Sequence, residues 1–387
     1  MGLGVSGCKA RRRTLLEEMD AALASGLRAL IGAQSSNGSW CSKTYGALKD
    51  GLSLTGPVLK AILYGPSVPG SERARRLGAE YLARRVRQDG SIDYGPFGAI
   101  YPVYSASTAA IVLSRYDTGS GTRPRDAWLA DLQSRQLTED LGWTPDDPAY
   151  GAWGYATFPT SKQSIDANAG SPADADLSST LFALGALGIS GSSNDTPAIQ
   201  KALQFVQRCQ NFDEHHSRFA DGGFFLSPTD PVRNKAGVAG VDSDGRERYH
   251  SYGGPTADGL RALLRCGLSA KHPRVIAARA WLENHFDPSR NPGTFEPIRE
   301  VERDATYYYT AWSTAHAFRA LGTSHFRSQG RDVPWTEELA KALIERQRPD
   351  GFWSNRWQAS KEDDPLIATP LALGALGICR MLTPTHP

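Results

Sequence analysis

The sequence lacks an excess of charge of either sign. Its 387 residues include 43 Lys and Arg and 41 Asp and Glu, so the formal net charge is only +2, and the two signs are well mixed along the chain. Nucleic-acid-binding proteins usually carry a basic patch or tail, and this chain has neither. We therefore expect a partner other than nucleic acid.

Cysteine is scarce and shows no pattern. None of the five cysteines belongs to a Cys-x-x-Cys pair, and they are widely separated: Cys8, Cys41, Cys209, Cys266 and Cys379. An odd number of scattered cysteines favours neither a disulfide framework nor a cysteine-rich zinc site. We expect a reducing compartment and therefore a cytoplasmic protein.

Long apolar runs are also missing. The first 13 residues end in three arginines and lack the apolar segment of a signal peptide. No other window reaches the roughly 18 consecutive apolar residues of a membrane-spanning helix. We expect residues 1–13 to be a disordered leader and the protein to have no transmembrane segment.

What the sequence does contain is a repeated pair of helical segments. In residues 14–34 apolar residues recur at spacings of three and four, which is typical of an amphipathic helix, and residues 53–63 are helical but almost wholly apolar. This pair recurs down the chain. One threonine occupies the same place in each of six apolar segments: Thr55, Thr108, Thr180, Thr256, Thr310 and Thr369. Six repeats in one register indicate a repeat architecture.

The apolar segments have no polar face, so an open array of repeats would expose them to water. Closing the array into a ring, with six apolar helices inside and six amphipathic helices outside, buries all of them. We therefore predict an all-α fold in which residues 14–382 form a single (α/α)6 barrel.

Two turns carry a more specific pattern. Gln34-x-x-x-Gly38-x-Trp40 and Gln347-x-x-x-Gly351-x-Trp353 resemble the Q-x-x-x-G-x-W repeat of the squalene–hopene and oxidosqualene cyclases. The chain is similar to proteins with prenyltransferase and squalene-oxidase repeats, the terpenoid cyclase and protein prenyltransferase superfamily. In such a turn glycine permits the tight bend, glutamine can bond free backbone groups at a helix end, and tryptophan packs across the joint. These are structural roles.

The third apolar segment begins with an acidic, hydroxyl-rich cluster that runs from Asp174 to Thr180. Class II cyclases carry Asp-x-Asp-Asp-Thr here, and the resemblance implies that the middle aspartate protonates an alkene or epoxide. Alignment on Thr180 places Ser178 at the acid position, whereas alignment on Asp174 and Asp176 keeps an acid but shifts the threonine out of register. We take Asp176 as the first candidate acid, with Asp174 in reserve and with Ser178 and Tyr309 as positioning groups.

This cluster has two other interpretations. Aspartate and serine are preferred helix N-caps, so Asp176 also fits a purely structural role, and that alternative stays open. Protein prenyltransferases place Asp-x-Cys here and a histidine before the fifth threonine, where this chain has Ser178 and Tyr309. Neutral hydroxyls beside one carboxylate make a poor zinc site. We predict no bound metal and no cofactor.

The resemblance also implies a central cavity at the N-terminal ends of the inner helices. Residues just before the shared threonines, with aromatic residues near them, become candidates for substrate binding: Tyr104, Trp143, Trp153, Tyr155, Tyr252, Tyr308, Trp312, Asp304 and Asp364. Aromatic faces stabilise cations, which suits a reaction through a carbocation.

We therefore predict a terpene cyclase-like enzyme, an isomerase or lyase of isoprenoid biosynthesis that cyclises or isomerises an apolar small molecule. Two alternatives remain. The same barrel can hold a lipid or peptide without turnover, or it can be an α/α-barrel carbohydrate-active enzyme, which needs two opposed carboxylates such as Asp176 and Asp364. The sequence does not indicate an oligomeric state.

Overall fold

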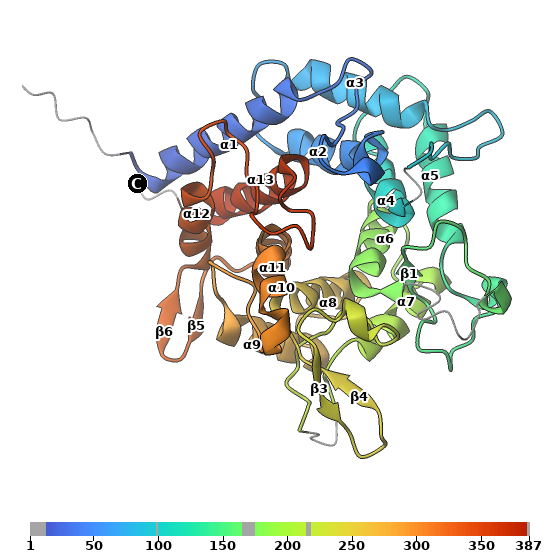
Figure 1. Cartoon of the computed structure of the whole chain (residues 1–387), viewed down its shortest axis with the longest axis vertical. Helices are drawn as coiled ribbons and strands as arrows, with labels where there is room; N and C mark the ends of the chain where they lie inside the picture. Colours follow the sequence, from blue (N-terminus) through green and yellow to red (C-terminus); the bar gives the residue numbers. More distant parts are fainter. Residues whose placement is uncertain (1–12, 98–99, 165–174, 214–217, 385–387) are drawn as a thin grey trace, which may run out of the picture.

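The computed structural model describes residues 13–97, 100–164, 175–213 and 218–384 (Figure 1). Thirteen α-helices and only short strands lie within these ranges, which confirms the all-α expectation. The leader predicted for residues 1–13 lies, apart from Arg13, outside the described residues.

The helices alternate between two environments along the chain. The amphipathic helices are α1 (Leu15–Gly32), α3 (Ser71–Ala83), α5 (Arg123–Ser134), α7 (Pro197–Arg208), α9 (Pro273–His285) and α12 (Trp335–Glu345). Between them come the more fully buried α2 (Leu52–Tyr64), α4 (Pro102–Leu113), α6 (Leu177–Ile189), α8 (Gly253–Arg265), α11 (Tyr307–Ala320) and α13 (Pro365–Leu382). The short α10 (Glu300–Ala305) precedes α11.

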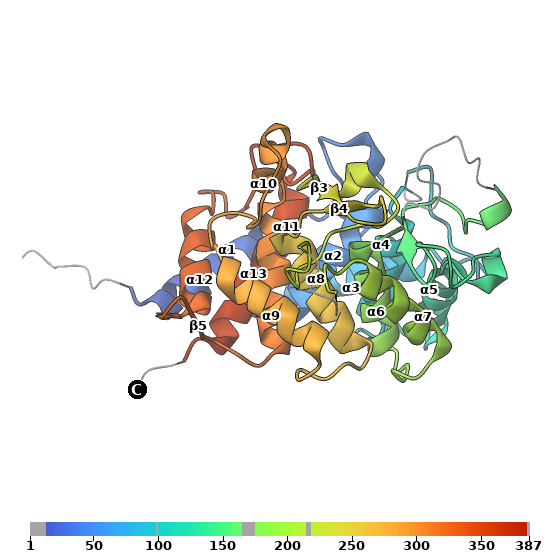
Figure 2. The same cartoon turned by 90° about the horizontal axis from the view of Figure 1, so that it is seen from below.

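The buried helices contact one another in cyclic order. α2 packs against α4, α4 against α6, α6 against α8, α8 against α11 and α11 against α13, and α13 returns to α2. Figure 1 shows these helices around a centre, with the amphipathic helices outside them. In the side view, α10 stands at one end of the ring (Figure 2). Ser105 Oγ in the first turn of α4 donates to Ser53 Oγ in the first turn of α2 at 3.2 Å, so the N-terminal ends of these two helices are adjacent.

Short strands and 3₁₀ turns, which the sequence pattern did not predict, occur in the connections. β1 (Trp153–Gly154) pairs with β2 (Ala175–Asp176), β3 (Val238–Val241) with β4 (Glu247–Tyr249), and β5 (Phe326–Ser328) with β6 (Arg331–Val333), all antiparallel. The 3₁₀ turns are Gly46–Leu48, Glu139–Leu141, Lys162–Ser164, Pro231–Arg233 and Pro297–Arg299.

Four of the six shared threonines join a turn to the inner helix that follows it. The hydroxyl of Thr55 accepts a hydrogen bond from the backbone N–H of Trp40 at 3.1 Å. Thr180, Thr256 and Thr369 accept the equivalent bond from Trp153, Phe224 and Trp353, at 3.1, 3.0 and 3.0 Å. A buried N–H that lacked this acceptor would be costly, which explains why the same residue type recurs in these repeats.

The glutamine of each turn ties neighbouring helix pairs together. Gln34 Nε2 donates to the carbonyl of Gly38 in its own turn, at 2.9 Å, and to that of Ala74 in α3, at 3.0 Å. Gln347 bonds Gly351 at 2.9 Å and Ala22 in α1 at 3.0 Å, so this bond links the last turn to the first helix.

Two further glutamines, which the sequence pattern missed, make the same pair of hydrogen bonds. Gln136 donates to Gly151 at 2.9 Å and to Ala198 at 2.8 Å, and Gln210 donates to Gly222 at 3.0 Å and to Arg274 at 2.9 Å. Insertions separate these glutamines from their glycines, so the fixed spacing of the motif is lost while its bonding is kept.

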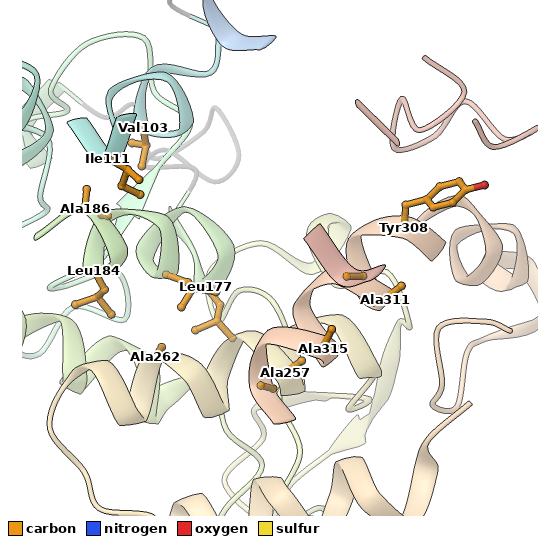
Figure 3. Packing of buried hydrophobic residues seen from close by; sticks show 14 of the residues in the cluster. Val103, Ile111, Leu177, Leu184, Ala186, Ala257, Ala262, Tyr308, Ala311 and Ala315 are labelled. Atoms are coloured by element: carbon orange, nitrogen blue, oxygen red, sulfur yellow. The ribbon is translucent and has the colours of Figure 1, made fainter. Parts of the chain in front are cut away.

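Small side chains allow the inner helices to approach closely. Figure 3 shows Ala257 and Ala262 of α8 and Ala311 and Ala315 of α11 among the buried residues between these helices. Gly259 of α8 lies under the ring of Phe224, where a Cβ atom would be 2.3 Å from the ring carbon Cδ1.

Helix α13 has the length and apolar composition of a membrane-spanning helix, and among the described helices it is the one that meets both conditions. The sequence analysis did not predict it. In the structure α13 packs against α1, α2, α11 and α12, and just over half of its residues are buried. These contacts are those of a helix in a protein core.

Candidate functional site

A central cavity of about 1760 Å3 is enclosed by all six inner helices. Its wall includes Lys60 of α2, Tyr104 of α4, Phe182 of α6, Asp258 of α8 and Trp312 of α11, and several residues of α13 also contribute. Ligand cavities in proteins usually measure about 300–1,000 Å3, so this one has room for a large molecule.

One side of the wall is a continuous row of aromatic rings. Tyr155 lies 5.5 Å from Tyr104 between ring centroids, Tyr104 lies 4.7 Å from Phe182, Phe182 lies 5.6 Å from Trp312, and Trp312 lies 5.8 Å from Tyr309. The faces of such rings carry partial negative charge and attract a cation that forms next to them. The row connects the first turns of α4 and α11.

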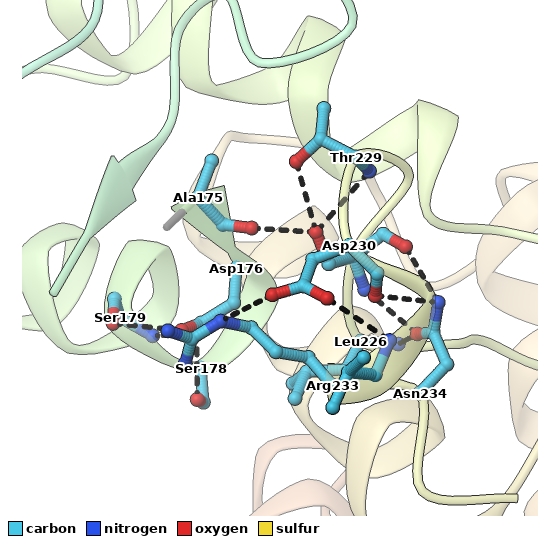
Figure 4. A network of polar contacts seen from close by, with 11 residues as sticks. Ala175, Asp176, Ser178, Ser179, Leu226, Thr229, Asp230, Arg233 and Asn234 are labelled. Carbon is cyan, nitrogen blue, oxygen red and sulfur yellow. Dashed lines mark hydrogen bonds and ion pairs between the residues drawn. The ribbon is translucent and has the colours of Figure 1, made fainter. Parts of the chain in front are cut away.

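Asp176 caps the N-terminus of α6 directly behind this wall. Its Oδ1 accepts hydrogen bonds from the backbone N–H of Ser179 at 2.7 Å and from Ser178 Oγ at 2.8 Å, while Ser179 Oγ donates to Oδ2 at 3.2 Å (Figure 4). The pairing of Trp153 with Asp176 between β1 and β2 fixes the backbone before the cap. The capping role that the sequence left open is therefore present.

The environment of Asp176 also favours a bound proton. Its side chain is fully buried, and this burial raises the pKa of Asp176 to about 6, although the bond from Ser179 and the charge of Arg233 act in the opposite direction. Arg233 in turn pairs with Asp230 at 3.1 Å and stacks 4.6 Å from the ring of Tyr155. A carboxyl in this state can hold a proton near neutral pH.

Ser178 connects this carboxyl to the cavity. Its hydroxyl bonds Asp176 and lies 2.7 Å from the hydroxyl of Tyr104, which lies 2.9 Å from that of Tyr155. Ser178, Tyr104 and Tyr155 line the cavity, and Asp176 does not. Within the described residues, Ser178 therefore gives a hydrogen-bonded path from Asp176 to the cavity wall.

A second buried carboxyl, Asp258 on α8, lies on the cavity wall itself. Tyr309 Oη donates to its Oδ2 at 2.7 Å, Ser313 Oγ donates to Oδ1, and Arg261 forms an ion pair with it at 3.5 Å. Burial raises the pKa of Asp258, and the charge of Arg261 lowers it. The sequence analysis missed this residue, although an aspartate two positions after a shared threonine in an apolar helix is a usable signal.

A third buried carboxyl, Glu362, comes just before α13. It accepts the backbone N–H groups of Tyr308 at 2.9 Å and Tyr309 at 2.7 Å and thereby caps α11. Burial raises the pKa of Glu362 to about 7. The sequence analysis chose its neighbour Asp364, but Asp364 caps α13 by accepting from the N–H of Leu366 at 2.9 Å and does not line the cavity.

The sequence-predicted residues divide into two groups. Those on the cavity wall are Ser178, Tyr309, Tyr104, Tyr155, Tyr252 and Trp312. Those placed away from it are Asp176, Trp143, Trp153, Tyr308, Asp304 and Asp364. Asp174 lies outside the described residues.

The distant aromatic residues have structural contacts instead. Trp153 is fully buried and donates from Nε1 to the carbonyl of Leu132 at 2.7 Å, and Trp143 donates to that of Thr160 at 2.9 Å. Across the described parts of the chain, no group of three or more His, Cys, Asp or Glu side chains is arranged to hold a metal ion.

Comparison with known proteins identifies the fold. No protein-family model and no curated protein matches the sequence. The type II terpene cyclase MstE from Scytonema, in complex with geranylgeranyl dihydroxybenzoate as substrate, matches with a TM-score of 0.59 at 14% identity, over 95% of this chain and 99% of that one. The complex of MstE with its product merosterolic acid A gives 0.58 at 14% identity, with the same coverage.

Two further structures share the architecture. A protein from Actinoplanes matches with a TM-score of 0.52 at 13% identity, over 94% of this chain and 99% of that one. A glycosidase matches with a TM-score of 0.50 at 10% identity, over 95% and 98%. At these identities the similarity concerns the fold, and this chain has a terpenoid cyclase-like fold.

Proposed function

We propose that this protein is a terpene cyclase-like enzyme that binds an apolar, isoprenoid-derived substrate in the central cavity and cyclises or isomerises it. In this proposal residues 14–382 act as one (α/α)6 barrel and the enzyme is an isomerase or lyase of isoprenoid biosynthesis in the cytoplasm. The observation that carries it is the hydrogen-bonded path from the buried carboxyl of Asp176 through Ser178 to the aromatic cavity wall.

The reaction begins with a proton transfer. Protonated Asp176 gives its proton to Ser178 Oγ as the hydroxyl proton of Ser178 moves to a terminal carbon of a substrate alkene. The alkene π electrons form the new C–H bond, and the positive charge appears on the neighbouring carbon. The buried carboxyl suits this role because its pKa of about 6 leaves part of it protonated near neutral pH.

The cavity wall acts on the cation that results. Further alkene π electrons attack the positive carbon and close rings, and the charge moves along the chain past Tyr104, Phe182 and Trp312. Their faces stabilise each cation through their quadrupoles. The last cation loses a proton to water, which leaves a product with the mass of the substrate, and a proton from solvent returns Asp176 to its protonated state.

The proposal is supported by the fold of MstE, whose complex contains geranylgeranyl dihydroxybenzoate as substrate. We expect this chain to accept a related prenylated small molecule. This chain has Ser178 and Ser179 in place of the two adjacent aspartates of Asp-x-Asp-Asp. The proposed acid, Asp176, therefore lies behind Ser178, and the hydroxyl of Ser178 is the group that contacts the substrate.

The experiment uses the full chain in deuterated water with geranylgeranyl dihydroxybenzoate, geranylgeranyl diphosphate and squalene, and follows products by liquid chromatography and mass spectrometry. Acid initiation adds one deuteron from solvent to each product molecule, which separates cyclisation by protonation from other rearrangements. We expect Asp176→Asn and Ser178→Ala to abolish the deuterated product.

Asp364→Asn is the matched control, because Asp364 is also a buried N-cap of an inner helix but lies away from the cavity. If the two Asp-to-Asn variants lose the same stability and both keep full activity, Asp176 is only a helix cap and the proposed acid is wrong. If no substrate is turned over but a lipid stays bound through purification, the barrel is a binding protein.

A further inference from the structure

Basic side chains collect in the half of the cavity formed by the later turns of the inner helices. Lys60 of α2, Arg261 and Arg265 of α8 and His316 of α11 all line it. Lys60 Nζ lies 5.2 Å from the centroid of the Trp312 ring, the guanidinium of Arg261 lies 4.5 Å from it, and the ring of His316 lies 4.7 Å from it. Side chains from three helices therefore surround one indole.

Too few carboxylates contact these basic side chains to balance their positive charge. Asp258 is the carboxylate that contacts the cluster within the described residues, and it pairs with Arg261 at 3.5 Å. Arg265 donates to the backbone carbonyl of Leu181 at 2.8 Å, which satisfies an N–H group but supplies no charge. Lys60 has no hydrogen bond or ion pair among the described residues, and its ammonium lies over the indole of Trp312.

Mutual repulsion and burial act on every member of the cluster. Burial, with the charges of Arg261 and Arg265, lowers the pKa of Lys60 to about 7. Burial and Arg261 lower the pKa of Arg265 to about 9, and burial with the surrounding cations lowers the pKa of His316 well below its usual value. Arg261 is buried and Lys60, Arg265 and His316 are half-buried on the cavity wall. Cations held there without partners are costly unless a ligand supplies the opposite charge.

We infer that this basic cluster, Lys60, Arg261, Arg265 and His316, binds a terminal oxyanion, a carboxylate or phosphate group, at one end of the apolar ligand. The inference rests on the proposed function for the apolar part of that ligand. Ser178 and Tyr104 lie in the first turns of α6 and α4, at the other end of the ring. An anionic group held at the cluster directs the far end of the chain towards Ser178.

This arrangement makes the ligand amphiphilic and sets its direction. The ammonium of Lys60 and the guanidinium groups donate charge-assisted hydrogen bonds to an oxyanion, and these are about twice as strong as neutral ones. Trp312 lies between the cluster and Phe182 of the aromatic row, so the charged end and the reacting alkene occupy different parts of one cavity.

The test compares three ligands with the same prenyl chain by isothermal titration calorimetry: geranylgeraniol, geranylgeranoic acid and geranylgeranyl monophosphate. We expect the wild-type protein to bind at least one anion at least about ten-fold more tightly than the alcohol. The carboxylate and phosphate arms decide which oxyanion fits. At pH 8 the bound anion should also cause proton uptake by Lys60, measurable from titrations in buffers of different ionisation enthalpy.

Lys60→Met is the informative variant, and Lys49→Met is its matched control. Lys49 also lies over an aromatic ring, 5.6 Å from the centroid of Phe97, but it is exposed and does not line the cavity. We expect Lys60→Met to lose the preference for the anion and the proton uptake, and Lys49→Met to keep both. Lys60→Met removes a half-buried charge that has no ion pair among the described residues, so it should fold and melt at a higher temperature than the wild type.

Two results would overturn the inference. One is equal affinity of the wild type for the alcohol and both anions, and the other is an anion preference that Lys60→Met leaves unchanged. Failure of the proposed function is a different outcome. A protein that prefers the anion but forms no cyclised product supports the anion-binding site and refutes the proposed cyclase function. A protein that cyclises the substrate without any preference for the anion supports the cyclase function and refutes the anion-binding site.

Discussion

Replacing Asp176 with asparagine tests whether its carboxyl carries a proton inside the folded protein. The folded protein raises the pKa of this group from 3.8 to about 6, because the side chain is fully buried behind Ser178. The difference, 6 minus 3.8, is about 2 pKa units, and at 1.36 kcal/mol per unit it is equivalent to about 3 kcal/mol of unfolding free energy.

The sign of the effect follows from where the proton binds more tightly. Above pH 3.8 the unfolded chain releases this proton, while the folded protein keeps it until about pH 6. The contribution of Asp176 to stability is therefore complete below pH 3.8 and is lost as the pH rises through 6. Asparagine cannot titrate, and its carbonyl oxygen can still accept the N–H of Ser179.

The assay is urea unfolding of the wild type and Asp176→Asn between pH 4 and 7.5, followed by far-ultraviolet circular dichroism. The unfolding free energy of the variant minus that of the wild type should rise by about 2–2.5 kcal/mol across this range, slightly less than the full effect because pH 4 already lies above the unfolded pKa. Glu362 titrates in a similar window, with a pKa of about 7, but it is present in both proteins and cancels in the difference.

Parallel pH profiles of the two proteins would refute this reasoning, because they would mean that Asp176 is ionised throughout and serves only as a cap. Glu362→Gln provides an independent comparison. Its difference from the wild type should develop between pH 4.5 and 7, a window shifted upward from that of Asp176.

Two further predictions concern the scaffold. Gln136→Ala should lower the unfolding free energy by about 1–3 kcal/mol in denaturant titrations, because it removes the donor to two backbone carbonyls, whereas alanine at the exposed Gln133 in the last turn of α5 should change little. Gly259→Ala should cost about 1–3 kcal/mol in the same assay, because its Cβ atom would meet Phe224 at 2.3 Å. Alanine at Gly188, where no atom lies within 4 Å of the added Cβ, is the control, and equal effects at the two glycines would contradict the packing argument.

The sequence determined the helical class and the repeat. The alternation of amphipathic and apolar segments depends on local periodicity, which a linear pattern records directly. The repeated threonine could also be seen, and the structure gives its reason in the bond from Trp40 to Thr55 and its equivalents. Gln136 and Gln210 escaped notice because insertions changed the spacing while the bonds stayed the same.

Only the tertiary structure decided which polar groups face the cavity. Asp258 and Glu362 line it and Asp364 does not, because the rotation of α8 and the path of the loop before α13 set the direction of each side chain. The basic cluster could not be foreseen either, since Lys60 and Arg261 come from distant parts of the chain and meet only through the packing of the inner helices around Trp312. The local hydrophobic pattern determines which helices lie inside the ring, and only the packing of these helices determines which side chains face the cavity.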